Sequence, residues 1–223
     1  MSRVEICRRV EEVGIVPVVR APSAELALRA AEAVLAGGIS IFEITMTVPD
    51  APAVIRTLVQ RLGDRAVVGA GTVLDADAAH RCIEAGAAFI VSPGFDLGTI
   101  VAAHERDVPI MPGALTPTEV ITAWKAGADM VKIFPASAVG GPKYLKALKG
   151  PLPDVKMLPT GGVNASTAGE FIAAGAAALG VGSELVDIAA LQRGEDAVIT
   201  ARARELVAAV QAARAKLQNA SQE

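Results

Sequence analysis

The chain has few cysteines, few aromatic residues and no long apolar run, and each scarcity excludes a class of protein. Two cysteines in 223 residues, Cys7 and Cys82, are too few for the disulfide framework of a secreted domain, so we expect a reducing, cytoplasmic setting. Aromatic residues make up 3% of the chain and the formal net charge is −3, which disfavours nucleic acid as a partner. Charged residues or glycines interrupt every apolar stretch before the roughly 18 residues that a membrane span needs. The first residues mix acids with bases around no apolar core, so we expect no secretory signal.

Small aliphatic residues take the place of the missing aromatics. Hydrophobic residues make up 52% of the chain, which also holds 21 glycines. Ala, Val, Ile and Gly dominate, a composition typical of strands that are buried on both faces and closely approached by helices. Short apolar runs recur at intervals of about 20–26 residues, close to the size of one βα unit. They are Ile15–Val19, Ile41–Met46, Val67–Gly71, Phe89–Val91, Ile110–Met111, Met130–Phe134, Val155–Leu158 and Ala178–Val181.

Helical patterns separate these runs. They begin at residues that cap helices and end beside glycines, over Ser23–Ala36, Asp75–Ala85, Thr116–Ala126 and Asn164–Ala174. Residues 1–13 predict an additional N-terminal helix, and residues 194–218 a final one. The alternation predicts an α/β protein with one domain over residues 1–223, a single (β/α)8 TIM barrel with an extra N-terminal helix. A doubly wound open sheet is the alternative, but the GxGxxG turn usual in that fold does not follow the first strand.

Two charged residues, Glu43 and Lys132, lie in the middle of apolar runs. A charge inside a buried strand is costly unless it is paired or functional. Alternate residues of a strand share a face, so both side chains can point into a barrel and meet near its upper end. Burial favours an uncharged lysine, which attacks carbonyl carbons, and a protonated glutamate, which can pass protons. The alternative is a buried ion pair with a structural role alone.

Other candidates for catalysis or metal binding fall away from the expected carboxyl ends of the strands, where such barrels carry their chemistry. Lys156 lies early in its strand, so it should emerge at the opposite end of the barrel. His80 and His104 fall on helices. A magnesium site would need several acidic residues at strand ends, and Glu43 is the only clear one. We therefore expect no metal.

Glycine-rich turns follow the last two strands. Thr160–Val163 reads TGGV and leads into a helix expected at Asn164, and Gly180–Glu184 reads GVGSE, with Ser183 expected to open the next helix. Glycine N–H groups and helix N-termini bind anions, and phosphate sites of these barrels commonly follow strands seven and eight. The pair of turns predicts a phosphate or another anion. An uncharged hydroxyl tail on the substrate is the competing interpretation.

Taken together, these motifs resemble those of the bacterial 2-keto-3-deoxy-6-phosphogluconate and 4-hydroxy-2-oxoglutarate (KDPG/KHG) aldolases. The resemblance runs from GIVPVVR to GVGSEL, nearly the whole chain. It rests on GGISIFEITM, VGAGTVLDADAAHRCIEAGAAFIVSPGFD, PIMPGALTPTE, GADMVKIFPAS and LPTGGVN, in the same order. It implies a class I aldolase, which forms a Schiff base on a (β/α)8 barrel, requires no cofactor and is commonly a homotrimer.

The resemblance also implies roles for individual residues. Lys132 in VKIFP matches the Schiff-base lysine, and Glu43 in FEITM matches the glutamate that transfers protons. The implied substrate-binding positions are Thr72 and Pro93 in the pyruvate pocket, Phe134 beside the lysine, Thr160 where the family sets the stereochemistry of the new carbinol, and Gly161, Gly162 and Ser183 at the phosphate end.

The sequence departs from part of the family at one position. Four residues after the glutamate, some members carry an arginine that holds the carboxylate of pyruvate, and this chain has Thr47 there. Arg20, at the end of the first strand, resembles an arginine of other members. A guanidinium grips a carboxylate through two hydrogen bonds, which a threonine cannot do. Arg20 and Thr47 are therefore both candidate substrate-binding residues.

The implied reaction is the reversible cleavage of a 4-hydroxy-2-oxo acid to pyruvate and an aldehyde. With 2-dehydro-3-deoxy-6-phosphogluconate the aldehyde is glyceraldehyde 3-phosphate, and with 4-hydroxy-2-oxoglutarate it is glyoxylate. One alternative is the aldolase for 2-dehydro-3-deoxy-6-phosphogalactonate. A second is a phosphate-binding barrel isomerase or synthase that forms no imine, and a third is a barrel that only binds a phosphorylated metabolite. In every case the expected partner is a small molecule.

Overall fold

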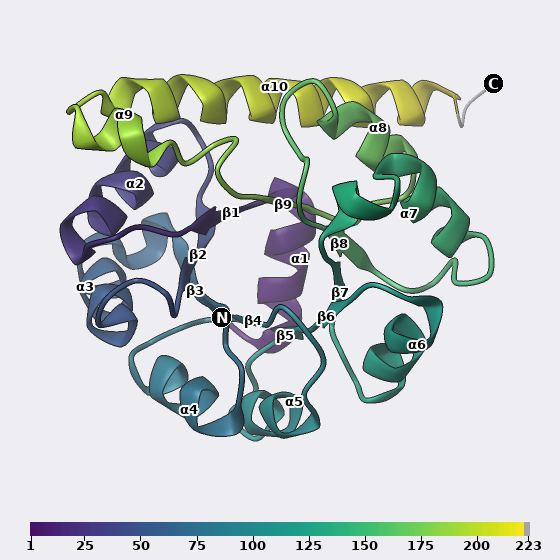
Figure 1. Cartoon of the computed structure of the whole chain (residues 1–223), viewed down its shortest axis with the longest axis horizontal. Coiled ribbons are helices and arrows are strands. Elements are labelled where there is room, and N and C mark those ends of the chain that lie inside the picture. Colours follow the sequence, from purple (N-terminus) through teal and green to yellow (C-terminus); the bar gives the residue numbers. More distant parts are fainter. Residues whose placement is uncertain (221–223) are drawn as a thin grey trace.

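The computed structural model describes residues 1–220, in which parallel strands alternate with helices packed around them (Figure 1). The strands are β1 (Ile15–Val19), β2 (Ile41–Thr45), β3 (Val67–Gly71), β4 (Ile90–Val91), β5 (Ile110–Met111), β6 (Gly113–Ala114), β7 (Val131–Ile133), β8 (Met157–Pro159) and β9 (Leu179–Val181). The α-helices are α1 (Arg3–Val13), α2 (Ala24–Ala36), α3 (Ala51–Leu62), α4 (Ala76–Glu84), α5 (Leu97–His104), α6 (Pro117–Lys125), α7 (Pro142–Lys149), α8 (Ala168–Ala173), α9 (Ile188–Gln192) and α10 (Asp196–Ala220). Two short 3-10 helices are η1 (Gly63–Arg65) and η2 (Ala136–Val139).

The strands of the described residues form two parallel ladders. One has the order β5-β4-β3-β2-β1-β9 and the other the order β6-β7-β8. An isolated bridge between Thr160 and Gly180 joins the two, and the N–H of Asp129 donates to the carbonyl of Ile110 across the other gap. The expected fifth strand, Ile110–Met111, is β5, and Pro112, which has no N–H for a ladder, separates it from the additional short strand β6. The predicted closed (β/α)8 barrel is therefore confirmed only in part, as a curled parallel sheet with helices around it.

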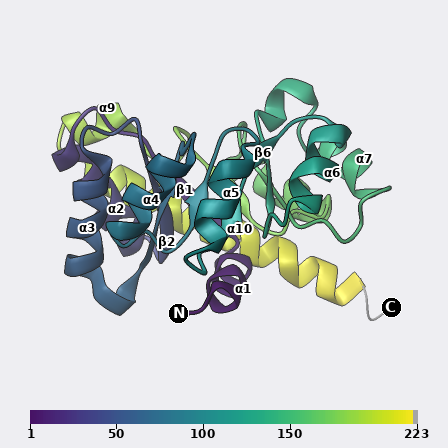
Figure 2. The same ribbon diagram turned by 90° about the horizontal axis from the view of Figure 1, so that it is seen from below.

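Buried side chains fill both sides of the curled sheet. The larger cluster lies between the strands and the surrounding helices. The smaller one takes residues from the strands, such as Val16, Ile41 and Val91, together with Ile6 and Val10 of α1. The extra N-terminal helix predicted from the sequence thus covers one end of the sheet with apolar side chains, and Figure 2 shows it below the strands.

The helices after the first, third and sixth strands begin where the sequence predicts. The side chains of Ser23, Asp75 and Thr116 each accept a hydrogen bond from a backbone N–H three residues ahead. Thr116 and Glu119 also form the predicted capping box. The final helix, α10, runs to Ala220 and packs against α2 and α8. Within residues 1–220, no helix combines the length and the apolar character that a membrane crossing needs.

Two helices begin later than the sequence predicts. The helix expected from Asn164 is α8, which begins at Ala168, because Oδ1 of Asn164 accepts from the backbone N–H groups of Ser166 and Thr167 and holds a turn. The helix expected from Ser183 is α9, which begins at Ile188. The segments that follow β8 and β9 are therefore loops over the first residues after each strand.

Candidate active site

The two charged residues of the buried strands meet in the structure. Glu43 lies in β2 and Lys132 in β7, and Nζ of the lysine is 3.7 Å from Oε1 of the glutamate. The side chains are 2% and 7% exposed. Oε1 of Glu43 has no hydrogen-bond partner among the described residues. The pair brings a proton acceptor beside an amine in surroundings that exclude most water, where electrostatic interactions are strong.

Burial raises the pKa of Glu43 above its ordinary value. Removal of the carboxylate from water is the largest cause, and the positive charges of Lys132 and Arg20 oppose it. The sequence predicts this direction for a glutamate in a strand buried on both faces. A carboxyl group shifted in this way exchanges protons closer to neutral pH, as general acid–base catalysis requires.

Gly71, the last residue of β3, makes room for the carboxyl group of Glu43. The register of the two strands pairs Thr45 with Gly71. A Cβ atom at position 71 would lie 2.6 Å from both Cδ and Oε1 of Glu43. A glycine inside a strand commonly marks such a close approach. The second glycine of the GAGT motif is therefore a requirement of the site.

Lys132 faces a cavity of about 420 Å³ at the carboxyl ends of the strands. The loops that follow β1, β3, β4, β7, β8 and β9 all contribute to its wall. The structure thus places together residues that the sequence scatters over several βα units. The predicted site residues that line the cavity are Arg20, Thr72, Pro93, Lys132, Phe134, Thr160, Gly161, Gly162 and Ser183.

Thr47, a predicted substrate-binding residue, does not line this cavity in the described part of the chain. Its hydroxyl oxygen is 2.7 Å from that of Thr45, and Thr45 donates to the carbonyl oxygen of Val19 at 3.2 Å. Arg20, the residue after Val19, does line the cavity. Of the two candidates for holding a carboxylate, the structure therefore brings Arg20 to Lys132 and holds Thr47 behind it.

Three residues shape the wall beside Lys132. The ring of Phe134 lies 5.3 Å from Nζ, within the range of a cation–π contact. Thr160 is 6% exposed, and its Oγ1 has no hydrogen-bond partner among the described residues. Thr72 has a φ of 58°, a left-handed conformation that is rare for a β-branched residue and commonly marks a functional site.

The glycines of the TGGV loop are in a left-handed conformation. Gly161 and Gly162 have φ values of 99° and 72°, a conformation that glycine adopts without steric cost. A Cβ atom on Gly162 would lie 2.6 Å from Cβ of Ser137, so no larger residue fits there. Ser183, from the neighbouring loop, lines the same cavity. The two helix N-termini expected beside these loops are absent, since α8 and α9 begin at Ala168 and Ile188.

The segment after β9 contributes residues that the sequence reasoning missed. A helix that began at Ser183 would carry the following residues away from the cavity. Because the sequence predicts such a helix, it does not predict that these residues line the cavity. With α9 starting at Ile188, the loop instead lies along the cavity wall. The missed residues from this segment are Gly182, Glu184, Val186 and Ile188, and those from other segments are Val18 and Val163.

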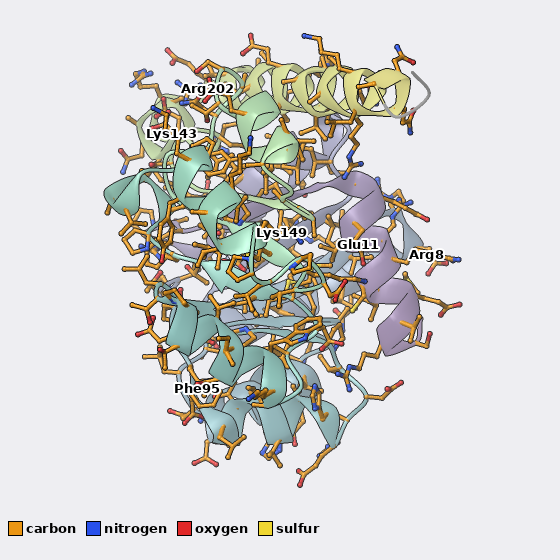
Figure 3. All side chains as sticks on the ribbon, turned by 90° about the vertical axis from the view of Figure 1, so that its right-hand side faces the viewer. Arg8, Glu11, Phe95, Lys143, Lys149 and Arg202 are labelled. Atoms are coloured by element: carbon orange, nitrogen blue, oxygen red, sulfur yellow. The ribbon has the colours of Figure 1, made fainter. Side chains whose placement is uncertain are left out.

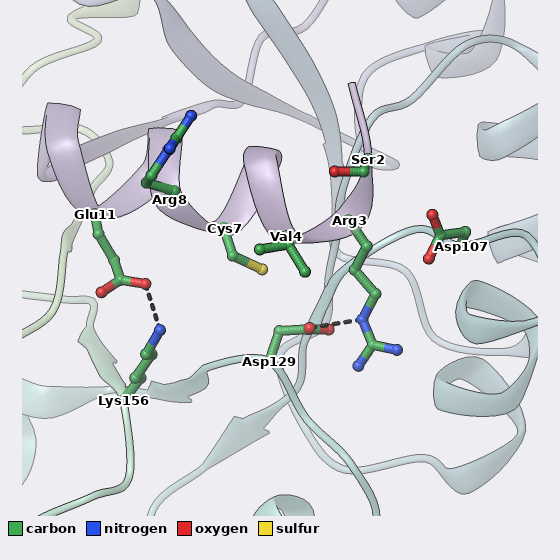
Figure 4. A pocket seen from close by; sticks show the side chains of 9 residues that line it. All are labelled: Ser2, Arg3, Val4, Cys7, Arg8, Glu11, Asp107, Asp129 and Lys156. Carbon is green, nitrogen blue, oxygen red and sulfur yellow. Dashed lines mark hydrogen bonds and ion pairs between the residues drawn. The ribbon is translucent and has the colours of Figure 1, made fainter.

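Lys156 lies at the other end of the strands. Its Nζ is 2.5 Å from Oε1 of Glu11 in α1, the helix that covers that end (Figure 4). Figure 3 shows Glu11 on the side of the molecule away from Phe95 and Lys143, which belong to segments that follow β4 and β7. Lys156 is thus where its early position in the strand predicts, and it is separated from the cavity.

Metal ligands and reactive thiols are not grouped in the described residues. Residues 1–220 contain no cluster of three or more His, Cys, Asp or Glu side chains that could hold a metal ion. Both cysteines are free, and burial raises the pKa of Cys7 to about 12 and that of Cys82 to about 11. Neither is a thiolate near neutral pH, so neither thiol competes with Lys132 as a nucleophile.

Known proteins resemble this chain over most of its length. The family model described as "KDPG and KHG aldolase" matches residues 6–202. The KHG/KDPG aldolase of Escherichia coli (strain K12) is 37% identical over 193 residues, which are 86% of this chain and 90% of that protein. The 2-dehydro-3-deoxy-6-phosphogalactonate aldolase of the same strain is 37% identical over 172 residues, 77% of this chain and 83% of that protein.

A solved structure extends the likeness to three dimensions. It is the crystal structure of KDPG aldolase from Legionella pneumophila, in which pyruvate is captured as a covalent carbinolamine intermediate. It is 32% identical to this chain, covers 90% of this chain and 97% of that protein, and superimposes with a TM-score of 0.83. Sequence and backbone therefore agree on the same relatives.

Proposed function

Since the chain belongs to the KDPG and KHG aldolase family, we propose that its cavity is the site of a Schiff-base aldol cleavage. One observation carries the proposal, namely the buried amine of Lys132 that lies 3.7 Å from the carboxyl group of Glu43 and faces the cavity. The structure from Legionella pneumophila, with pyruvate captured as a carbinolamine, supports the same chemistry by likeness. The reaction is that of a pyruvate-dependent lyase.

In the first half of the reaction the lysine captures the keto acid. The lone pair of Nζ of Lys132 attacks the C2 carbonyl carbon of a 4-hydroxy-2-oxo acid, and a proton passes from the nitrogen to the carbonyl oxygen to give a carbinolamine. Glu43 then supplies the proton with which the hydroxyl group leaves as water, and an iminium ion remains on the lysine. The raised pKa of Glu43 suits a group that must hold a proton and then release it.

In the second half the C3–C4 bond breaks. A base removes the proton of the C4 hydroxyl, the C3–C4 electron pair moves into the iminium, and an aldehyde leaves an enamine behind. The enamine takes a proton at C3, and water then hydrolyses the iminium to pyruvate and free lysine. We assign the proton transfers to Glu43 because no other carboxyl group among the described residues forms an ion pair with Lys132.

The substrate is held at both ends. Arg20 supplies the guanidinium for the carboxylate of pyruvate, since it lines the cavity and Thr47 does not. The loops that carry Gly161, Gly162 and Ser183 receive the phosphate at the far end. Thr72, Pro93 and Phe134 line the space between. The curled sheet acts as a (β/α)8 barrel in this arrangement, with the chemistry at its carboxyl end.

The preferred substrate is 2-dehydro-3-deoxy-6-phosphogluconate, with 4-hydroxy-2-oxoglutarate as a second substrate. The family model and the relatives named KHG/KDPG aldolase support this choice. The relative that acts on the phosphogalactonate epimer is equally identical over a shorter stretch, so that epimer is the alternative substrate. Parallel assays with both phosphorylated sugar acids decide between them, and the larger kcat/KM identifies the substrate.

Incubation with pyruvate and sodium borohydride, followed by peptide mass spectrometry, tests the chemistry. We expect reduction to fix a pyruvyl group on Lys132. Lys132→Met removes the nucleophile and should give no adduct and no turnover, whereas Lys156→Met is the matched control and should behave as wild type. A folded protein without an adduct would exclude the imine and favour a phosphate-binding isomerase. An adduct at Lys156 would mean that the chemistry takes place at the opposite end of the strands, away from the proposed cavity.

We propose further that the protein is a cytoplasmic homotrimer, as the family resemblance implies. Exposed apolar side chains gather where the segments after β3 and β4 lie side by side. Leu74, Phe95, Leu97 and Val101 are 62%, 38%, 55% and 47% exposed, and Gly98 of α5 lies against Ala76 of α4. We call these four side chains the α4–α5 patch. Exposed apolar side chains on neighbouring segments are typical of contacts between subunits.

A further inference from the structure

Two threonine hydroxyls lie in line behind Arg20. Thr45 is fully buried, and its hydroxyl donates to the carbonyl oxygen of Val19 at 3.2 Å. The hydroxyl oxygen of Thr47 lies 2.7 Å from that of Thr45. Because a hydroxyl has one proton and that of Thr45 is directed at Val19, the proton between the two hydroxyls comes from Thr47. The chain of donors therefore runs from Thr47 through Thr45 to the backbone of β1.

This chain of hydroxyls begins where the backbone ladder ends. The register between β1 and β2 pairs Val18 with Glu43 and Val19 with Ile44, and it stops there. The next residue, Arg20, lies beyond the end of β1. The Thr45 side chain thus ties the last peptide group before Arg20 to the end of β2, in place of a further ladder bond. Buried hydrogen bonds of this kind fix the direction in which a chain leaves a strand.

We propose that Thr47 and Thr45 are positioning residues, which hold the Val19 peptide group so that the guanidinium of Arg20 faces the carboxylate of the substrate. The inference rests on the proposed role of Arg20. It also explains why a threonine at position 47 serves the site although it does not line the cavity. A fixed peptide group at Val19 limits the positions that the guanidinium of Arg20 can reach, so less conformational freedom is lost when it binds a carboxylate. The hydroxyls therefore contribute to affinity and not to the chemical step.

Pyruvate-dependent trapping by borohydride measures the effect. Thr47→Val keeps the shape of the side chain and removes the hydroxyl. We expect the pyruvate concentration for half-maximal trapping, and KM for the cleavage substrate, to rise about two- to tenfold, the range that one hydrogen bond supplies. We expect kcat to stay close to wild type, because neither threonine touches Lys132. Thr47→Ser keeps the hydroxyl donor and should leave KM close to wild type. Thr47→Ala, which lacks the hydroxyl, should match Thr47→Val.

A double-mutant cycle separates this role from a general structural one. If the hydroxyls act through Arg20, Thr47→Val should raise KM no further in an Arg20→Gln background. The same rise in both backgrounds, or no rise in wild type, would overturn the proposal. The role of Arg20 is tested separately by Arg20→Gln alone. If the pyruvate concentration for half-maximal trapping stays normal in that variant, the proposed carboxylate site is refuted. Trapping of pyruvate at saturation in all variants would show that the Schiff-base chemistry stands in either case.

Discussion

The carboxyl group of Glu43 occupies the space that a side chain at Gly71 would fill. A Cβ atom there would lie 2.6 Å from Oε1. Gly71→Ala should therefore push the carboxyl group away from Lys132 and lower kcat about 10²-fold or more, the lower end of the 10²–10⁴-fold that a positioned acid–base group contributes. Gly94→Ala is the matched control, since that glycine follows Pro93 of the cavity wall and a Cβ atom there has nothing within 4 Å. Steady-state kinetics of the two variants make the comparison, and equal activities would contradict the proposed role of Glu43.

The raised pKa of Glu43 predicts how stability depends on pH. Burial favours the protonated carboxyl in the folded state, while the unfolded chain titrates near the ordinary value of 4.5. The folded protein therefore binds more protons than the unfolded one above that pH, and its free energy of unfolding should fall as the pH rises toward the folded pKa. Glu43→Gln removes this contribution. Urea unfolding of both proteins from about pH 4 upward should show a difference that changes with pH, and a constant difference would refute the shift.

The phosphate end can be tested apart from the imine. Gly162→Ala places a Cβ atom 2.6 Å from Cβ of Ser137 at a residue with a φ of 72°, so the TGGV loop must move. We expect kcat/KM to fall for the phosphorylated sugar acid and to stay closer to wild type for 4-hydroxy-2-oxoglutarate, which has no phosphate. Ser183→Ala should follow the same pattern more weakly, by the two- to tenfold of about one hydrogen bond. A parallel loss on both substrates would assign these loops to the folding of the site.

Arg214 of α10 predicts a local stability effect far from the cavity. Its guanidinium donates to the carbonyl oxygens of Glu11 and Glu12, at the last turn of α1, with distances of 2.5 and 2.6 Å. A cation at a helix C-terminus is favourable, and it here joins the first helix to the last. Arg214→Ala should lower the free energy of unfolding by about 1–2 kcal/mol. Arg204→Ala, at an exposed position of the same helix, is the control and should change it by less than about 0.5 kcal/mol.

The α4–α5 patch predicts the oligomeric state. Leu97→Asp together with Val101→Glu puts two charges of one sign into a surface that is apolar and should convert a trimer to a monomer, because burying unpaired charge costs several kcal/mol. Light scattering on a sizing column measures the mass of each variant. Val4→Lys, at an exposed position of α1 on another face, is the control and should leave the mass unchanged. If both proteins stay trimeric, the subunit contact lies elsewhere.

The sequence predicts that Glu43 and Lys132 meet because a charge inside a buried strand has few physical explanations. The pairing of Glu43 with Lys132 could be predicted although they are far apart in the sequence. Alternate residues of a strand share a face, and the number of strands predicts a barrel into which both side chains point. The capped helix starts at Ser23, Asp75 and Thr116 are local features, and local features can be read from a few residues.

The loops around the cavity were harder to predict. Asn164 is equally suited to cap a helix or to hold a turn, and only the surrounding structure decides that it holds a turn. The late start of α9 is likewise decided by the surrounding structure. The residues around Glu184 that line the cavity could therefore not be predicted from the sequence. The break at Pro112 has a local cause, since proline has no N–H for a ladder. The ladder that each neighbouring strand joins depends instead on hydrogen bonds between distant strands, which no local pattern contains.

The helix α1, with Ile6 and Val10 packed among the inner side chains of the sheet, fills the end opposite the cavity that Lys132 lines. The two products of the proposed cleavage then leave Lys132 in a fixed order. In the direction of cleavage, pyruvate stays covalently bound to Lys132 while the aldehyde diffuses out past it, so the aldehyde departs first and pyruvate second. In the direction of synthesis the order is reversed, and an aldehyde that occupies the cavity before pyruvate obstructs access to the amine. High aldehyde concentrations should for this reason slow synthesis in competition with pyruvate.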